Sequence, residues 1–128
     1  MAIESPPVLY IENGIIFEYH EDEVVTVELA YYAASERKRL AGNNKMPVMV
    51  SFKRLFGFTT ETREMDLDVI LANMSALAFY IEDNENKIPE SEKKLILTFY
   101  ETTPYPVPVK VFFDKSEAVD WLQGYIEK

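Results

Sequence analysis

The first pattern along the chain is a pair of short apolar runs separated by an Asn-Gly dipeptide. The runs cover residues 8–12 and 15–19, and Asn13-Gly14 lies between them. Asn-Gly flanked by apolar residues is a strong signal for a tight β-hairpin, because both residues adopt positive φ readily. If Glu12 pairs with Ile15, the period of two gives one face of the hairpin Val8, Tyr10, Phe17 and Tyr19. The opposite face then carries Leu9, Ile11 and Ile16.

Helical periodicity replaces this alternation after the hairpin. Helix-forming residues with apolar positions at helical spacing extend from Thr26, a predicted N-cap, to the Gly42 that closes the segment. A strand is expected over residues 47–52, and threonines then cap a second helix expected at about 60–72. The run 75–81 is continuously apolar, which is typical of a central strand that is buried on both faces and parallel to its neighbours.

Prolines and caps delimit the remaining elements. Pro89 and the acidic residues after it predict a third helix, although residues 95–100 within it also have the composition of a strand. Prolines at 104, 106 and 108 exclude a helix there and place the next strand, about 107–113, at an edge of the sheet. Asp114 and Glu117 form a capping box that opens a final helix. Its apolar stripe consists of Ala118, Trp121, Leu122 and Tyr125.

The resulting order of elements is β-β-α-β-α-β-α-β-α. The chain has no internal repeat and no linker long enough to separate domains, so residues 1–128 are expected to form a single domain. A hairpin followed by right-handed β-α-β crossovers predicts an α/β domain whose sheet is mixed but mostly parallel, with helices packed against it.

The amino-acid composition and net charge argue against several classes of protein and of binding partner. Apolar residues make up 48% of the chain and charged residues 27%, and the net charge of −9 argues against nucleic acid and anionic membrane surfaces as general partners. The absence of cysteine excludes disulfides and thiol chemistry. No apolar run approaches the ~20 residues of a membrane span, and the N-terminus has no signal-peptide pattern. We therefore expect a soluble, cytoplasmic protein.

Few residues suit catalysis. His20, the single histidine, lies in the acidic stretch 18–23, which suits a carboxylate-assisted base, a metal site or a solvated acidic turn. The consecutive placement of these residues favours the turn. The four glycines are too scattered for a phosphate-binding loop. The cations at 37–39 end the first helix, where they complement its dipole. The sequence therefore predicts no catalytic, cofactor-binding or metal-binding residue, and no enzyme activity.

Two surface features predict binding to another protein. The first 36 residues contain eight acidic residues and no Lys or Arg, with Glu21, Asp22 and Glu23 in succession. Segregated acidic charge suits a docking face for a basic partner, although solvation alone also explains it. The aromatic stripe of Tyr10, Phe17 and Tyr19 suits a homodimer contact, unless the chain termini or the first helix cover it.

The C-terminal string 109–122, VKVFFDKSEAVDWL, combines a strand ending in aromatic residues, an acidic cap and an Ala-x-x-Trp-Leu helix. Together with the element order, it resembles small single-domain proteins of the STAS superfamily, the fold of bacterial anti-sigma factor antagonists, and most of all an uncharacterised bacterial branch. The resemblance implies a non-enzymatic protein-interaction or regulatory domain, with another protein or a second copy as partner and no cofactor. It leaves open a small apolar, lipid-like ligand held between sheet and helices.

Antagonists of this superfamily carry a phosphorylatable serine at the start of the second helix. The matching positions here are Thr59 and Thr60, without the serine or the glycine that follows it. Because threonine also accepts phosphate, the resemblance leaves these two residues as the switch positions. Helix capping by the same threonines is the favoured explanation.

Overall fold

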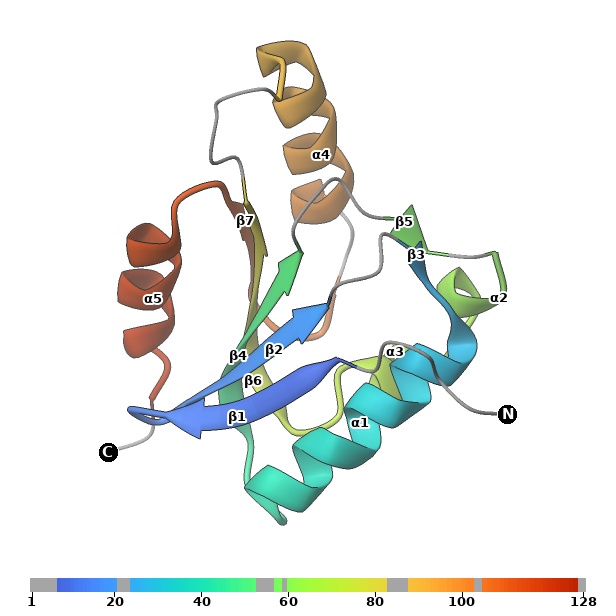
Figure 1. Ribbon diagram of the computed structural model, residues 1–128, viewed down its shortest axis with the longest axis vertical. Coiled ribbons are helices and arrows are strands. Elements are labelled where there is room, and N and C mark those ends of the chain that lie inside the picture. Colours follow the sequence, from blue (N-terminus) through green and yellow to red (C-terminus); the bar gives the residue numbers. More distant parts are fainter. Residues whose placement is uncertain are drawn as a thin grey trace.

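Five strands form the central sheet of the computed structural model, and helices pack on both of its faces (Figure 1). The structure describes residues 7–20, 24–52, 57–58, 60–82, 88–102 and 105–126. The main elements are β1 (Val8–Glu12), β2 (Ile15–His20), α1 (Val27–Ala41), β4 (Met46–Phe52), β6 (Met74–Ile81), α4 (Glu90–Thr102), β7 (Val109–Phe112) and α5 (Lys115–Gln123). Shorter elements are β3 (Val24–Val25), β5 (Gly57–Phe58), α2 (Thr60–Arg63) and α3 (Leu67–Ile70). None of the helices in these ranges is long and apolar enough to cross a membrane.

The N-terminal hairpin has the predicted register. Glu12 pairs with Ile15, and φ is 51° at Asn13 and 80° at Gly14. Both values lie in the left-handed region, which explains the Asn-Gly pair in the turn. The end of the chain packs on this turn, because a Cβ added to Gly14 would lie 3.3 Å from Cγ2 of Ile126.

The strand order explains which face each helix covers. The order is β1-β2-β4-β6-β7, in which β1 is antiparallel to β2 and all other neighbours are parallel. The parallel strands progress in one direction across the sheet, so right-handed crossovers place α1, α2, α3 and α4 on the same face. α5 follows the last strand and returns across the other face (Figure 1).

Each face of the sheet has its own apolar core. On the first face, Leu29 of α1, Ile70 of α3 and Ile96 of α4 belong to one cluster with residues of the strands. On the second face, Ala118 and Leu122 of α5 belong to a cluster that includes Met49, Ala78 and Phe112. The predicted α/β class, with a mixed and mostly parallel sheet, is confirmed.

Most of the predicted helix and strand positions are also confirmed. The Thr26 hydroxyl accepts from the backbone N–H of Leu29 at 3.2 Å and caps α1, and the Asp114 carboxylate caps α5 by accepting from Glu117 N–H at 3.2 Å. Residues 95–100 are helical and belong to α4. β7 lies at an edge of the sheet, as the prolines before it indicated.

The single helix expected over residues 60–72 is wrong, because two short helices occupy this segment. α2 ends in a turn in which Met65 N–H donates to the Thr62 carbonyl at 3.1 Å. The Asp66 carboxylate then accepts from Asp68 N–H at 2.9 Å and starts α3. Aspartate competes in this way with the continuing helix by bonding nearby backbone amides. The two-residue strands β3 and β5, which pair with each other, were also not predicted.

Candidate functional site

The hairpin surface comprises four residues of β1 and β2 on the α5 side of the sheet, where Glu12 and Ile15 also lie: Val8, Tyr10, Phe17 and Tyr19. Their placement on one face follows from the confirmed register, in which Val8 pairs with Tyr19 and Tyr10 with Phe17. α5 packs mainly on β4, β6 and β7. The part of this face that belongs to β1 therefore extends beyond the helix (Figure 1).

Exposure divides the hairpin surface into a covered and an open part. Phe17 is only 8% exposed and belongs to the core under α5, whereas Tyr10 is 43% and Val8 60% exposed. The Tyr10 ring stacks on the Phe17 ring with 5.3 Å between centroids. Lys115 Nζ lies 5.7 Å from the Phe17 centroid, so the start of α5 reaches this ring. Phe17 thus supports the ring of the exposed Tyr10.

The remaining predicted site residues lie largely outside the described part of the chain. Glu21, Asp22, Glu23 and Thr59 are not among the described residues, and neither is the side chain of Thr60, which begins α2. The switch and the acidic docking face therefore stay predictions.

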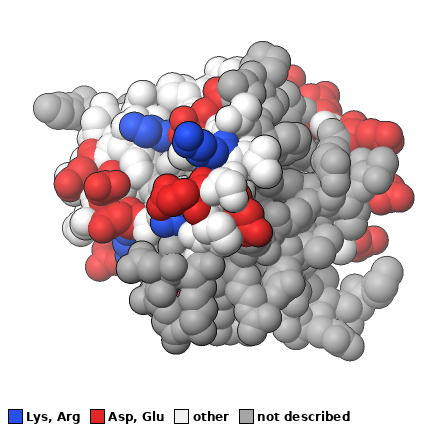
Figure 2. All heavy atoms as spheres, turned by 90° about the horizontal axis from the view of Figure 1, so that it is seen from above, with Lys and Arg blue, Asp and Glu red and all other residues white. Residues whose placement is uncertain are grey.

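Acidic charge in the described part of the chain is less segregated than the sequence indicated. Glu18 is buried, whereas exposed acids also occur on other elements, including Glu61 of α2 and Asp120 of α5. Figure 2, which looks onto the α4 end of the molecule, shows acidic side chains at both sides of the view. The described exposed acids thus occur on several elements rather than on the hairpin and the first helix alone.

Three ionisable side chains form a buried charge cluster between α1 and the sheet: Glu18, His20 and Arg37. Arg37 Nη1 donates to Glu18 Oε1 at 2.7 Å, and His20 Nε2 lies 2.6 Å from Glu18 Oε2. Arg37 Nε donates to the Ala72 carbonyl at 3.1 Å, and Nη2 donates to the Ile70 carbonyl. One guanidinium therefore ties α1 to β2 and to the end of α3.

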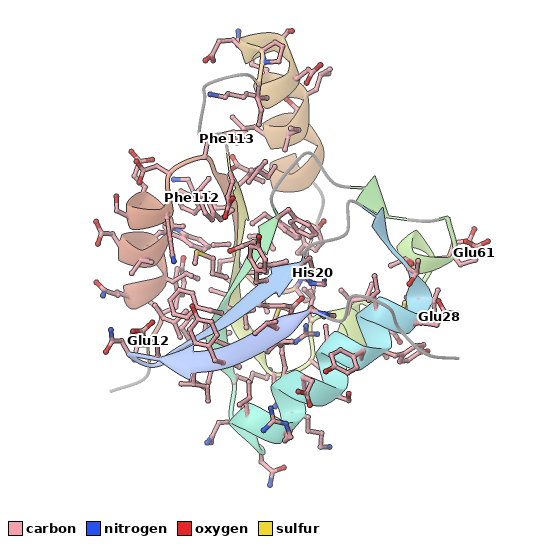
Figure 3. All side chains as sticks on the ribbon, in the orientation of Figure 1. Glu12, His20, Glu28, Glu61, Phe112 and Phe113 are labelled. Carbon is pink, nitrogen blue, oxygen red and sulfur yellow. The ribbon has the colours of Figure 1, made fainter. Side chains whose placement is uncertain are left out.

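The alternation of β2 explains how the charge cluster and the hairpin surface come to share a strand. Glu18 and His20 point toward α1, whereas Phe17 and Tyr19 point to the α5 side. The His20 ring stacks on Phe52 of β4 with 5.0 Å between centroids. In Figure 3, His20 lies at the end of β2 inside the domain. The interpretation of Glu18 and His20 as part of a solvated turn is therefore wrong.

Arg37 was also misassigned by the sequence pattern. It belongs to the buried stripe of α1, together with Leu29, Ala30, Ala33 and Ala41, and pairs with Glu18 rather than serving as a cation at the helix end. The small alanines leave room for a long side chain between helix and sheet. Of its two cationic neighbours, Arg39 fits the sequence interpretation better, because it pairs at the surface with Glu36 at 2.9 Å.

Electrostatics keep Glu18 ionised. Burial by itself raises the pKa of this carboxyl group, but the Arg37 guanidinium and the hydrogen bond from His20 outweigh burial and lower the pKa from 4.5 to about 2. An ionised carboxylate only accepts hydrogen bonds, so the His20 Nε2 atom carries the hydrogen in this contact. The cluster is therefore a paired charge network rather than an isolated buried charge.

We expect acid to weaken the fold through Glu18. A carboxyl group whose pKa is lowered on folding stabilises the folded state above its unfolded pKa, and this contribution is lost as the pH falls toward the folded value. A pKa of about 2 against 4.5 corresponds to about 3 kcal/mol, lost between about pH 5 and pH 2. Urea unfolding across this range should show a steeper loss in the wild type than in Glu18→Gln. Equal pH profiles would show that Glu18 is not paired in solution.

A cavity of about 50 Å³ adjoins the charge cluster. Apart from the three charged residues, its walls include Thr62 of α2 and apolar side chains of the sheet and α1. This volume has room for a few water molecules at most. It is too small for a lipid-like ligand. Among the described residues, no group of His, Asp and Glu is arranged to hold a metal ion.

An open depression of about 520 Å³ lies between α4, β7 and the start of α5. Its walls carry three carboxylates and one ammonium group, from Glu101, Lys110, Asp114 and Glu117. The other lining residues are apolar: Leu97, Val111, Phe112 and Phe113. Because charged groups form the rest of this open depression, it does not offer the mostly hydrophobic enclosure that an apolar ligand requires. Neither hollow therefore favours the small apolar ligand that the sequence left open.

The comparisons with known proteins agree with this architecture. Residues 9–126 match a family described as Domain of unknown function (DUF7793). Curated proteins give no match. A similar solved structure is the crystal structure of an uncharacterized protein from the DUF3478 family with a SpoIIAA-like fold, from Shewanella loihica PV-4. The two chains share 17% identity with a TM-score of 0.59, over 95% of this chain and 98% of that chain. This similarity confirms the STAS-like fold, and the chain belongs to the DUF7793 family.

Proposed function

We propose that this protein is a regulatory protein-binding domain that acts through the hairpin surface and the adjoining open edge of β1. The observation that carries the proposal is the exposure of β1. Val8 and Tyr10 are exposed on one face of this edge strand, and Ile11 is 41% exposed on the other. Glu12, next to the turn, is the one charged residue of β1. Natural edge strands usually carry charges, prolines or cover that prevent pairing, so an unprotected apolar edge favours a binding role.

The opposite edge of the sheet, formed by β7, is protected against pairing with another strand. The Glu101 carboxylate of α4 accepts from the Val111 N–H of β7 at 3.1 Å, and α4 packs along this strand. Among the residues that the structure describes, one edge of the sheet is thus covered and the other is not. This contrast supports a role for the β1 edge in binding.

The buried charge cluster supports the same role by holding in place β2, the strand on which β1 is paired. Glu18 lies between Phe17 and Tyr19 in β2, and Arg37 anchors its carboxylate to α1. A strand fixed in this way loses little conformational entropy when a partner binds, which favours affinity.

Site-specific photo-crosslinking tests the proposal. A photoreactive phenylalanine replaces Tyr10 in one variant and Leu95, which is 70% exposed on α4, in a control variant. We expect irradiation of cells to give discrete protein adducts from position 10, because a binding surface holds its partner within reach of the probe. Position 95 should give none. Adducts of equal yield from both positions, or none from position 10, would contradict a binding role for the hairpin surface.

A further inference from the structure

We infer that the partner of the β1 edge is a second copy of this chain, paired strand to strand about a two-fold axis at Tyr10. This inference rests on the proposed function and adds the identity of the partner. The two β1 strands would run antiparallel and join the two sheets into one continuous sheet. Three observations support it: the bonding pattern of the hairpin, the position of the charges, and the apolar exposure on both faces of β1.

The hairpin fixes which backbone groups of β1 point to the open edge. In a two-residue hairpin, the residues that flank the turn bond to each other, so Glu12 and every second residue before it direct their N–H and C=O groups toward β2. Leu9 and Ile11, at the alternate positions, direct theirs outward. No strand lies beyond β1 among the described residues to pair with these groups.

An axis at Tyr10 uses all of these outward groups. Leu9 of one copy then faces Ile11 of the other, and each such pair exchanges hydrogen bonds in both directions. An axis at Leu9 would instead match Ile11 with Pro7, which has no N–H to donate. An axis at Ile11 would match Leu9 with Asn13, which lies in the turn with φ of 51°. The backbone therefore selects the axis at Tyr10.

The side chains suit the same register. The two Tyr10 residues form a pair without backbone hydrogen bonds between them, in which cross-strand side chains approach most closely. Each Glu12 faces Val8 of the other copy, so the two carboxylates stay apart at opposite ends of the contact. On the α1 side, the exposed Ile11 lies beside Leu9 of the other copy.

A second copy fits this edge better than a basic peptide. Glu12 is the one charged residue of β1, which offers little to attract a cationic strand. The edge instead exposes apolar side chains on both of its faces, with Val8 and Tyr10 on one and Ile11 on the other. A partner strand that covers both must itself be apolar on both faces, and β1 has this pattern.

Sedimentation equilibrium of the purified protein, from micromolar to millimolar concentration, tests the inference. We expect the mass to rise from 14.8 kDa toward twice this value. Ile11→Pro removes an outward N–H without removing a bond to β2, so it should keep the mass at that of the monomer. Tyr10→Lys, which brings two ammonium groups together on the axis, should do the same. Leu95→Lys is the matched control and should dimerise like the wild type.

Circular dichroism shows whether each variant is folded, and Tyr10→Lys serves as the test if Ile11→Pro unfolds. A wild-type mass that stays at 14.8 kDa over the whole range overturns the second copy as partner. So does a mass that doubles in both β1 variants. If the wild type remains a monomer while position 10 still crosslinks to another protein in cells, the inference fails and the proposed function stands. If crosslinking fails as well, both are wrong.

Discussion

Replacing Arg37 by methionine is expected to lower the free energy of unfolding by about 3–5 kcal/mol, because it leaves a buried carboxylate without its cation. Glu18 loses the guanidinium that lies 2.7 Å from its Oε1 atom. The carbonyls of Ile70 and Ala72 lose their donor at the same time. Urea or guanidinium unfolding, followed by circular dichroism, measures the change.

Two further variants show whether charge pairing causes this loss. Lys38→Met removes an exposed cation from the adjacent position of α1 and should change stability by less than about 0.5 kcal/mol. The double variant Arg37→Met with Glu18→Met removes both charges and should recover about 1–3 kcal/mol relative to the sum of the single changes. An Arg37 variant as stable as the Lys38 variant would contradict the buried charge cluster.

Truncating Phe17 to alanine should cost about 3–5 kcal/mol, while truncating Tyr10 should cost only about 1 kcal/mol. The two rings stack on each other, but only Phe17 is buried among the residues under α5. Its removal leaves a cavity, whereas Tyr10 loses mainly the stacking contact. Unfolding should be measured at a protein concentration low enough to keep the chain monomeric.

This pair of variants distinguishes a core residue from a surface residue on one stripe of the hairpin. Similar losses for both would mean that Tyr10 is covered within a single chain, and would argue against its role in binding. The sequence pattern alone placed both rings in a single interface. Because Phe17 is buried, Phe17→Asp is expected to unfold the domain, and Tyr10 is the position at which binding is tested.

Local signals predicted most of the fold. The Asn13-Gly14 pair set the hairpin register, and Thr26 and Asp114 marked the starts of α1 and α5, because turns and caps depend on few neighbouring residues. The prediction of a single helix over residues 60–72 was wrong, again because of a local interaction. Asp66 starts a new helix within a segment whose apolar spacing is helical throughout. Apolar spacing alone does not show where such a side chain separates one helix from the next.

The candidate site was only partly predictable. The period of two placed Tyr10 and Phe17 on one face, but their exposure depends on where α5 crosses the sheet, which packing between distant segments decides. Arg37 was interpreted as a cation at the end of its helix. Its actual partners, Glu18, Ile70 and Ala72, could not be predicted because they lie far away in the sequence. One signal in the sequence points to the burial of Arg37: it continues, at helical spacing, a stripe of small residues that includes Ala30 and Ala33.

If the chain pairs through β1 as we infer, the unequal edges of the sheet also decide how far self-association proceeds. A contact that uses the same strand in both copies closes on itself, since neither copy has a second β1 to offer. If β7 were open as well, β1 of one molecule would meet β7 of the next, and growth would continue into a filament. In the inferred dimer, the Glu101 carboxylate on the Val111 amide would block further pairing at β7 and so limit the assembly to a pair.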